Sequence, residues 1–190
     1  MGSIRLVLAL SVIAAHTGAI FGVSGRLAVE LFFLISGYLI THILVGEKHY
    51  RSTRIFYVNR ALRIYPIYFL VALTSLALNV ILASVNASPV FRVFRSAGLD
   101  GMILLVFSNI SIFLQDATLF LDKPDGTWRI LNQISDSKLR LHEGLLVPPA
   151  WSLSLELTFY LLAPFLVKNR KVLLSIFLCS CVVKTSLIVL

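Results

Sequence analysis

Residues 4–45 read IRLVLALSVIAAHTGAIFGVSGRLAVELFFLISGYLITHILV, two apolar runs joined by a glycine-containing turn. Arg5, His16 and Glu30 lie inside these runs. An ionisable side chain near the centre of a bilayer costs about 2.5 to 3.5 kcal/mol, so such residues mark functional sites. We therefore predict a membrane helix hairpin that carries a polar site.

The composition indicates an integral membrane protein. Of the 190 residues, 58% are hydrophobic and 14% are charged, whereas about a quarter of the residues in a soluble domain are charged. The net charge is +8, and most Lys and Arg residues lie in short loops between the apolar runs. This is the pattern of membrane topology signals, so it argues against nucleic acid as a partner. The apolar runs long enough to span a bilayer are 6–21, 28–45, 67–85, 150–167 and 172–190, with a shorter run at 102–115.

These runs predict an all-α fold, a polytopic transmembrane helix bundle with about five to six membrane segments. We expect a single membrane-embedded domain over residues 1–190. The last run ends without a polar flank, so we also expect further helices beyond Leu190.

The first two helices predict the core of the site. Arg5 and His16 are eleven residues apart, which places them on one helix face with about 16 Å of rise between them. If both helices stop at the turn at 22–25, His16 and Glu30 lie at the same depth, about 8 Å below it. A carboxylate there would orient the imidazole and raise its basicity.

A basic interval at 46–66 carries Lys48, Arg51, Arg54, Arg60 and Arg63. The positive-inside rule places it, and with it the N-terminus, in the cytoplasm. Part of the interval is expected to lie on the membrane surface as a helix before Pro66 starts the third span. Arg60 and Arg63 share a helix face, a geometry that suits phosphate binding.

The topology depends on the run at 102–115, which is only 14 residues long and is either a marginal span or a re-entrant segment. A basic turn at 168–171 belongs in the cytoplasm only if that run is re-entrant. The loop at 116–149 is too long for a simple connector, so we expect it to be functional. In the next helix, Ser152 and Glu156 then approach the depth of His16 and Glu30.

Four motifs in this order resemble the acyltransferase-3 family of integral membrane O-acyltransferases. Arg5 and His16 are similar to its first-helix motif, and AVELFFLISGY at 28–38 is similar to its second-helix pattern. RALRIYP at 60–66 and WSLSLE at 151–156 look like its arginine pair and its late motif. Glu30 stands where the family usually has Asp, so the acidic function is kept.

The resemblance implies transfer of an acyl group, acetyl above all, from acyl-CoA to a hydroxyl of a carbohydrate or glycolipid acceptor. His16 and Glu30 are the expected catalytic residues, and the expected substrate-binding residues are Arg5, Arg60, Arg63, Ser152 and Glu156. The donor acyl-CoA is a substrate; no bound cofactor and no metal are expected. The implied location is the bacterial inner membrane, with the chain multi-pass in the lipid bilayer.

Blander interpretations stay open at each site. His16 can serve packing, Glu30 can pair with Arg26 one turn earlier, and the two arginines can be topology signals alone. A transporter or channel with a relay of His16, Glu30 and Glu156 is a second hypothesis, and an inactive fragment is a third. The relay hypothesis predicts no binding of acyl-CoA.

Overall fold

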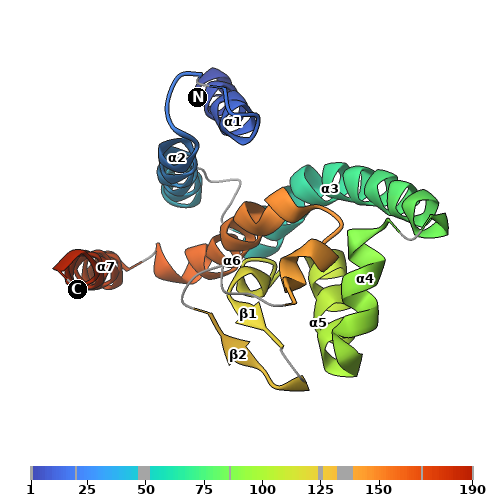
Figure 1. Ribbon diagram of the computed structural model, residues 1–190. Coiled ribbons are helices and arrows are strands. Elements are labelled where there is room, and N and C mark those ends of the chain that lie inside the picture. Colours follow the sequence, from blue (N-terminus) through green and yellow to red (C-terminus); the bar gives the residue numbers. More distant parts are fainter. Residues whose placement is uncertain are drawn as a thin grey trace. The chain divides into compact units, whose positions relative to one another are not determined.

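A computed structural model describes residues 2–19, 21–46, 52–85, 87–123, 126–131, 139–167 and 169–189. Its α-helices are α1 (Gly2–His16), α2 (Gly25–Gly46), α3 (Thr53–Ser84), α4 (Pro89–Ser96), α5 (Gly98–Ser111), α6 (Trp151–Leu166) and α7 (Arg170–Val189) (Figure 1). Short 3-10 helices are η2 (Ala117–Leu119), η5 (Leu141–Gly144) and η6 (Pro148–Ala150), and the strands are β1 (Leu121–Asp122) and β2 (Arg129–Ile130). The expected all-α class is confirmed.

The chain folds as two compact units. The first comprises Met1–Tyr57 and Phe159–Leu190, and the second comprises Val58–Thr158. The hairpin of α1 and α2 belongs to the first unit, and α4, α5 and the small β1–β2 hairpin belong to the second.

Two helices in the described part of the chain are long and apolar enough to cross a membrane, namely α2 with 22 residues and α3 with 32. Side chains on α3 such as Leu70 and Ile81 are 69% and 66% exposed, which fits a lipid-facing helix. Helices α1 and α5 have 15 and 14 residues, so they are only about 22 and 21 Å long against a hydrocarbon core of about 30 Å. The expectation of five to six membrane segments is therefore not confirmed.

The first helix ends earlier than expected. It stops at His16 instead of continuing to Phe21, because Gly18 adopts a left-handed conformation with φ +76°. The amide of Ala19 then donates to the carbonyl of Ala14 at 2.9 Å, the pairing that closes a Schellman motif. His16 thus occupies the last turn of α1 and not a position inside the helix.

The third helix begins earlier than expected. Proline normally interrupts a helix because it lacks an N–H and displaces a carbonyl of the preceding turn, yet α3 runs through Pro66 without a break. On either side of Pro66, Tyr65 donates to the carbonyl of Ser111 at 2.7 Å and Tyr68 donates to that of Asn109 at 2.8 Å. These contacts hold α3 against the C-terminal end of α5 on both sides of Pro66. Because α3 already begins at Thr53, the expected start of the third helix at Pro66 is wrong.

The second unit has its own core, in which residues of the long 116–149 loop take part. This core consists of Val93 in α4, Ala97 at the C-terminal end of α4, Leu105 in α5, and Leu141 and Leu145 in the loop. The buried amide of Asn109 clamps this loop, since it donates to Gly144 O at 3.1 Å and accepts from Leu146 N at 2.7 Å. The loop segment 141–146 is thus packed onto α4 and α5.

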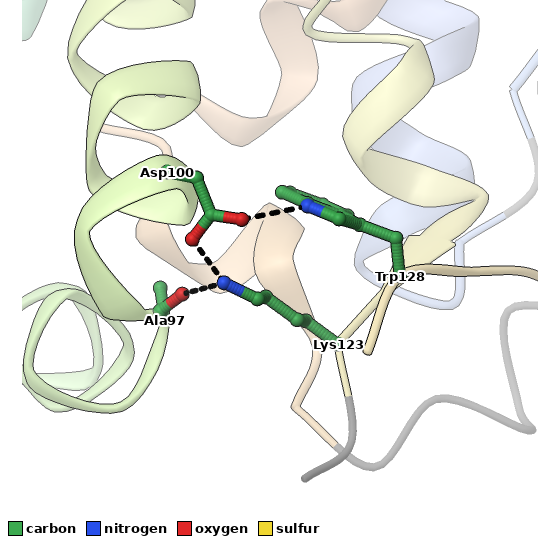
Figure 2. A network of polar contacts seen from close by, with 4 residues as sticks. All are labelled: Ala97, Asp100, Lys123 and Trp128. Carbon is green, nitrogen blue, oxygen red and sulfur yellow. Dashed lines mark hydrogen bonds and ion pairs between the residues drawn. The ribbon is translucent and has the colours of Figure 1, made fainter. Parts of the chain in front are cut away.

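The β1–β2 hairpin is fastened to the start of α5 by a polar network (Figure 2). Asp100 accepts hydrogen bonds from Lys123 Nζ and from Trp128 Nε1, the latter at 2.7 Å. Lys123 also donates to the carbonyl of Ala97 at 3.3 Å. The Lys123 ammonium holds the pKa of Asp100 down at about 2, with smaller support from Trp128.

Candidate functional site

The α1–α2 hairpin positions the residues of the first candidate site. Its two helices meet closely near the turn, where a Cβ on Gly25 would lie 2.8 Å from the Cβ of Ala15. Farther along, Leu8 and Ser11 of α1 and Ala28 of α2 are buried. Small residues at such an interface let helix backbones approach each other.

Arg5 lies over an aromatic ring of the neighbouring helix. Its Cζ is 4.3 Å from the ring centroid of Phe32, which is the distance of a cation–π contact. Because α1 is continuous from Arg5 to His16, the two residues share a helix face with about 16 Å of rise between them. The ring of Phe32 thus fixes a guanidinium at one end of the α1 face.

His16 lies exposed at the other end of that face. Its Nδ1 is 2.8 Å from the carbonyl oxygen of Val12, one turn earlier. A carbonyl only accepts, so Nδ1 carries a hydrogen, and in the neutral imidazole the lone pair is then on Nε2. The backbone therefore gives His16 an orientation and a tautomer suited to a general base.

Glu30 does not supply that orientation. Its Oε1 is 3.4 Å from Nε of Arg26 on the same helix, and both side chains are largely exposed. The two helices are antiparallel, since Gly25 lies beside Ala15 and Phe32 lies under Arg5. In the register set by Gly25 and Ala15, Glu30 lies about 9 Å along the hairpin from the level of His16. The expected equal depth is not found, because α1 ends at His16 and not five residues later.

The arginine pair of α3 lies in the second unit. Arg60 is only 8% exposed, whereas Arg63, one turn later, is exposed. One guanidinium is thus turned into the protein and the other outward. Of the remaining basic interval, Arg54 is exposed, while Lys48 and Arg51 lie outside the described residues.

The late motif on α6 places its polar residues differently. Glu156 is buried at 3% exposure, and Ser152 is half-buried with its hydroxyl donating to Pro149 O at 3.3 Å. The polar contact that the sequence did not reveal is that of Ser154, which is fully buried and donates to Asp116 Oδ1 at 2.7 Å. Its partner is 38 residues away, so no local pattern signals this bond.

The expected site residues divide between the two units. Arg5, His16 and Glu30 belong to the first unit. The second unit carries the other four, which are Arg60, Arg63, Ser152 and Glu156. The approach of Ser152 and Glu156 to the depth of the first-unit residues stays a prediction, as does the absence of a metal and of a bound cofactor. The basic turn at 168–171 includes Lys168, which lies outside the described residues, as does the side chain of Lys184 in the last run.

Comparison with known proteins adds the chemistry. A family model described as an acyltransferase domain matches residues 2–189. A relative from Rhizobium radiobacter, described as "Protein 2 in picA locus", is 33% identical over 165 residues, covering 83% of this chain and 75% of that protein. No solved structure matches the chain. Acyl transfer is thus the chemistry of the family, the family is membrane-associated, and the chain belongs to the acyltransferase-3 family.

Proposed function

We propose that the chain takes part in membrane O-acyl transfer, with acyl-CoA, and acetyl-CoA above all, as donor. The acceptor would be a hydroxyl of a carbohydrate or glycolipid, and the location the bacterial inner membrane. Family membership supports the acyl-transfer chemistry. The observation that carries the proposal is the His16–Val12 hydrogen bond, which leaves Nε2 of an exposed histidine as a proton acceptor.

The reaction would use His16 first as base and then as acid. Nε2 takes the proton of the acceptor hydroxyl while its oxygen attacks the thioester carbonyl, so that a C–O bond forms and the C–S bond breaks. The leaving thiolate then receives that proton from His16. Protons and electrons balance without a further reactant.

Arginine side chains are proposed to hold the donor. Arg5, seated on Phe32, lies about 16 Å of helix rise from His16, which suits a donor with a long arm. Arg63 is exposed on α3 and is available for a donor phosphate, whereas Arg60, one turn earlier, is buried and is assigned to the same donor site from the protein side of the helix. The cytoplasmic ends of these helices are where acyl-CoA is expected to enter.

Three further residues complete the proposal. Ser152 and Glu156 are assigned to acceptor binding, with Ser152 the more accessible of the two. Glu30 stays a candidate catalytic residue. Because its carboxylate is paired with Arg26, we propose that it contributes to the electrostatic field near the turn and does not set the tautomer of His16.

Binding of radiolabelled acetyl-CoA to the purified, detergent-solubilised chain tests the donor assignment. Wild type should bind saturably, and Arg63→Ala and Arg60→Ala/Arg63→Ala should bind progressively less. Arg54→Ala is the matched control, because Arg54 is an exposed arginine on the same helix outside the proposed pair. If wild type is monodisperse and helical but does not bind acetyl-CoA saturably, the donor assignment is contradicted and the relay hypothesis is favoured.

A further inference from the structure

Two adjoining hollows lie in the second unit, away from the residues assigned above. One has a volume of about 510 Å³ and the other about 380 Å³. Arg92 of α4 and Glu143 of η5 line both of them. Hollows of 300 to 1,000 Å³ are typical of small-molecule sites. Because the two hollows share these two residues, we treat them together and call them the Arg92 cleft.

The charges in the Arg92 cleft favour an anion. Arg140 Nη1 lies 3.3 Å from Oε1 of Glu143, so these two charges offset each other. Arg92 is exposed, and in the described part of the chain its guanidinium has no side-chain partner. One positive charge is left over. Burial lowers the pKa of the neighbouring His142, so its imidazole adds no charge near neutral pH.

The walls of the larger hollow are mostly apolar. Val90 and Leu145 are buried there, and Pro89, Leu146 and Pro148 complete this surface. A guanidinium binds the two oxygens of a phosphate with parallel hydrogen bonds. The ligand that fits both features is an amphiphile with one phosphate next to an apolar body.

The cleft adjoins the C-terminal end of the long apolar helix α3. The apolar stretch of α3 from residue 67 to its end at Ser84 is about 27 Å long, close to the hydrocarbon thickness. Asn79, in the last two turns of α3, lines the cleft and accepts a hydrogen bond from Ser88 at 2.8 Å. Ser88 in turn caps α4, which carries Arg92. With residues 67–84 spanning the bilayer, the guanidinium of Arg92 would lie toward the headgroup layer at that end of α3.

We propose that the Arg92 cleft binds the phosphate of an anionic phospholipid. Arg92 holds the phosphate, and the prolines and leucines contact the glycerol and the first acyl carbons. The inference concerns the second unit alone, so it stands or falls independently of acyl transfer.

The test measures the melting temperature of the purified full chain in detergent during titration with dioctanoyl-phosphatidylglycerol. Dioctanoylglycerol supplies the same tails without a phosphate, and inorganic phosphate supplies the anion without tails. The variants are Arg92→Ala, Arg92→Lys and, as matched control, Arg95→Ala, because Arg95 is exposed on the same short helix and lines neither hollow.

Wild type and Arg95→Ala should be stabilised saturably by phosphatidylglycerol alone. Arg92→Ala should bind phosphatidylglycerol about tenfold more weakly than wild type, the loss expected for a charge-assisted hydrogen bond. The affinity of Arg92→Lys should lie between those of Arg92→Ala and wild type, because lysine keeps the charge but lacks the two parallel donors of a guanidinium. Equal binding by Arg92→Ala and wild type overturns the proposal. Stabilisation by dioctanoylglycerol equal to that by phosphatidylglycerol also overturns it, because the cleft would then bind acyl tails alone. Equal stabilisation by inorganic phosphate at the same concentration overturns it as well, because the cleft would then bind a soluble anion.

Discussion

Nδ1 of His16 donates to the carbonyl oxygen of Val12, 2.8 Å away in the preceding helical turn. The bond ties the imidazole to the end of α1 and presents Nε2 to the exterior. A backbone group cannot be lost by side-chain substitution at Val12. The orientation of the candidate base is thus a property of the helix end itself.

The tautomer of His16 can be observed directly. In the chain labelled with ¹⁵N-histidine, the neutral His16 ring should carry its hydrogen on Nδ1, since the Val12 carbonyl accepts from that atom. Nitrogen NMR distinguishes the two ring nitrogens, and His16→Gln assigns the signals. A neutral ring with its hydrogen on Nε2 would contradict the described geometry.

Gly25 should tolerate no larger side chain. Gly25→Ala places a Cβ 2.8 Å from that of Ala15, so α1 and α2 must move apart. We expect a loss of about 1 to 3 kcal/mol in the free energy of unfolding, the usual cost of overpacking. Gly37→Ala on the same helix is the control, because nothing lies within 4 Å of its added Cβ. Equal stability of the two variants in denaturant titrations would refute the close contact.

Phe32 is expected to position Arg5 without touching the reacting atoms. Phe32→Leu removes the ring under the guanidinium, a contact worth about 0.5 to 2 kcal/mol. The dissociation constant for acetyl-CoA should rise about twofold to thirtyfold, and Phe32→Tyr should restore it because the ring is kept. Phe33→Leu is the neighbouring control. An unchanged dissociation constant in Phe32→Leu would remove Arg5 from the donor site.

Acid should release the β1–β2 hairpin. Because Lys123 lowers the pKa of Asp100 from 3.8 to about 2, the stabilisation from the carboxylate is complete above its unfolded pKa and is lost as the pH falls through about 2. In a Trp151→Phe background, Trp128 emission reports the release. Asp100→Asn should shift that emission to the red already at neutral pH, whereas Glu143→Gln should not. A neutral-pH spectrum unchanged by Asp100→Asn would show that the network does not hold the hairpin.

The apolar runs predicted where helices lie, since a run of that length has few other ways to satisfy its backbone. Helix ends were less predictable. The first helix was expected to continue to the turn at 22–25, but the Schellman bond to Ala14 and the left-handed Gly18 end it at His16. Pro66 suggested a helix start, but the hydrogen bonds of Tyr65 and Tyr68 to α5 are tertiary contacts that no local pattern contains.

Within the site too, contacts between residues close in sequence could be predicted, and contacts between distant residues could not. The spacing of Arg26 and Glu30 left their ion pair open as an alternative, and the structure contains it. The spacing of Arg5 and His16 predicted their common helix face. The bond between Ser154 and Asp116 and the clamp of Asn109 on Gly144 join residues 38 and 35 positions apart. Only the folded chain brings these partners together.

The most direct test of the account is acyl transfer by His16 variants. Membranes containing the wild-type chain, His16→Ala or His42→Ala would be incubated with [¹⁴C]acetyl-CoA, and the label counted in the glycolipid and polysaccharide fractions. His42 is the control because it is an exposed histidine on α2, stacked on Tyr38. Wild type and His42→Ala should transfer label, and His16→Ala should fall to background at equal protein level. Transfer by His16→Ala at the wild-type rate would contradict the role of His16 as the base.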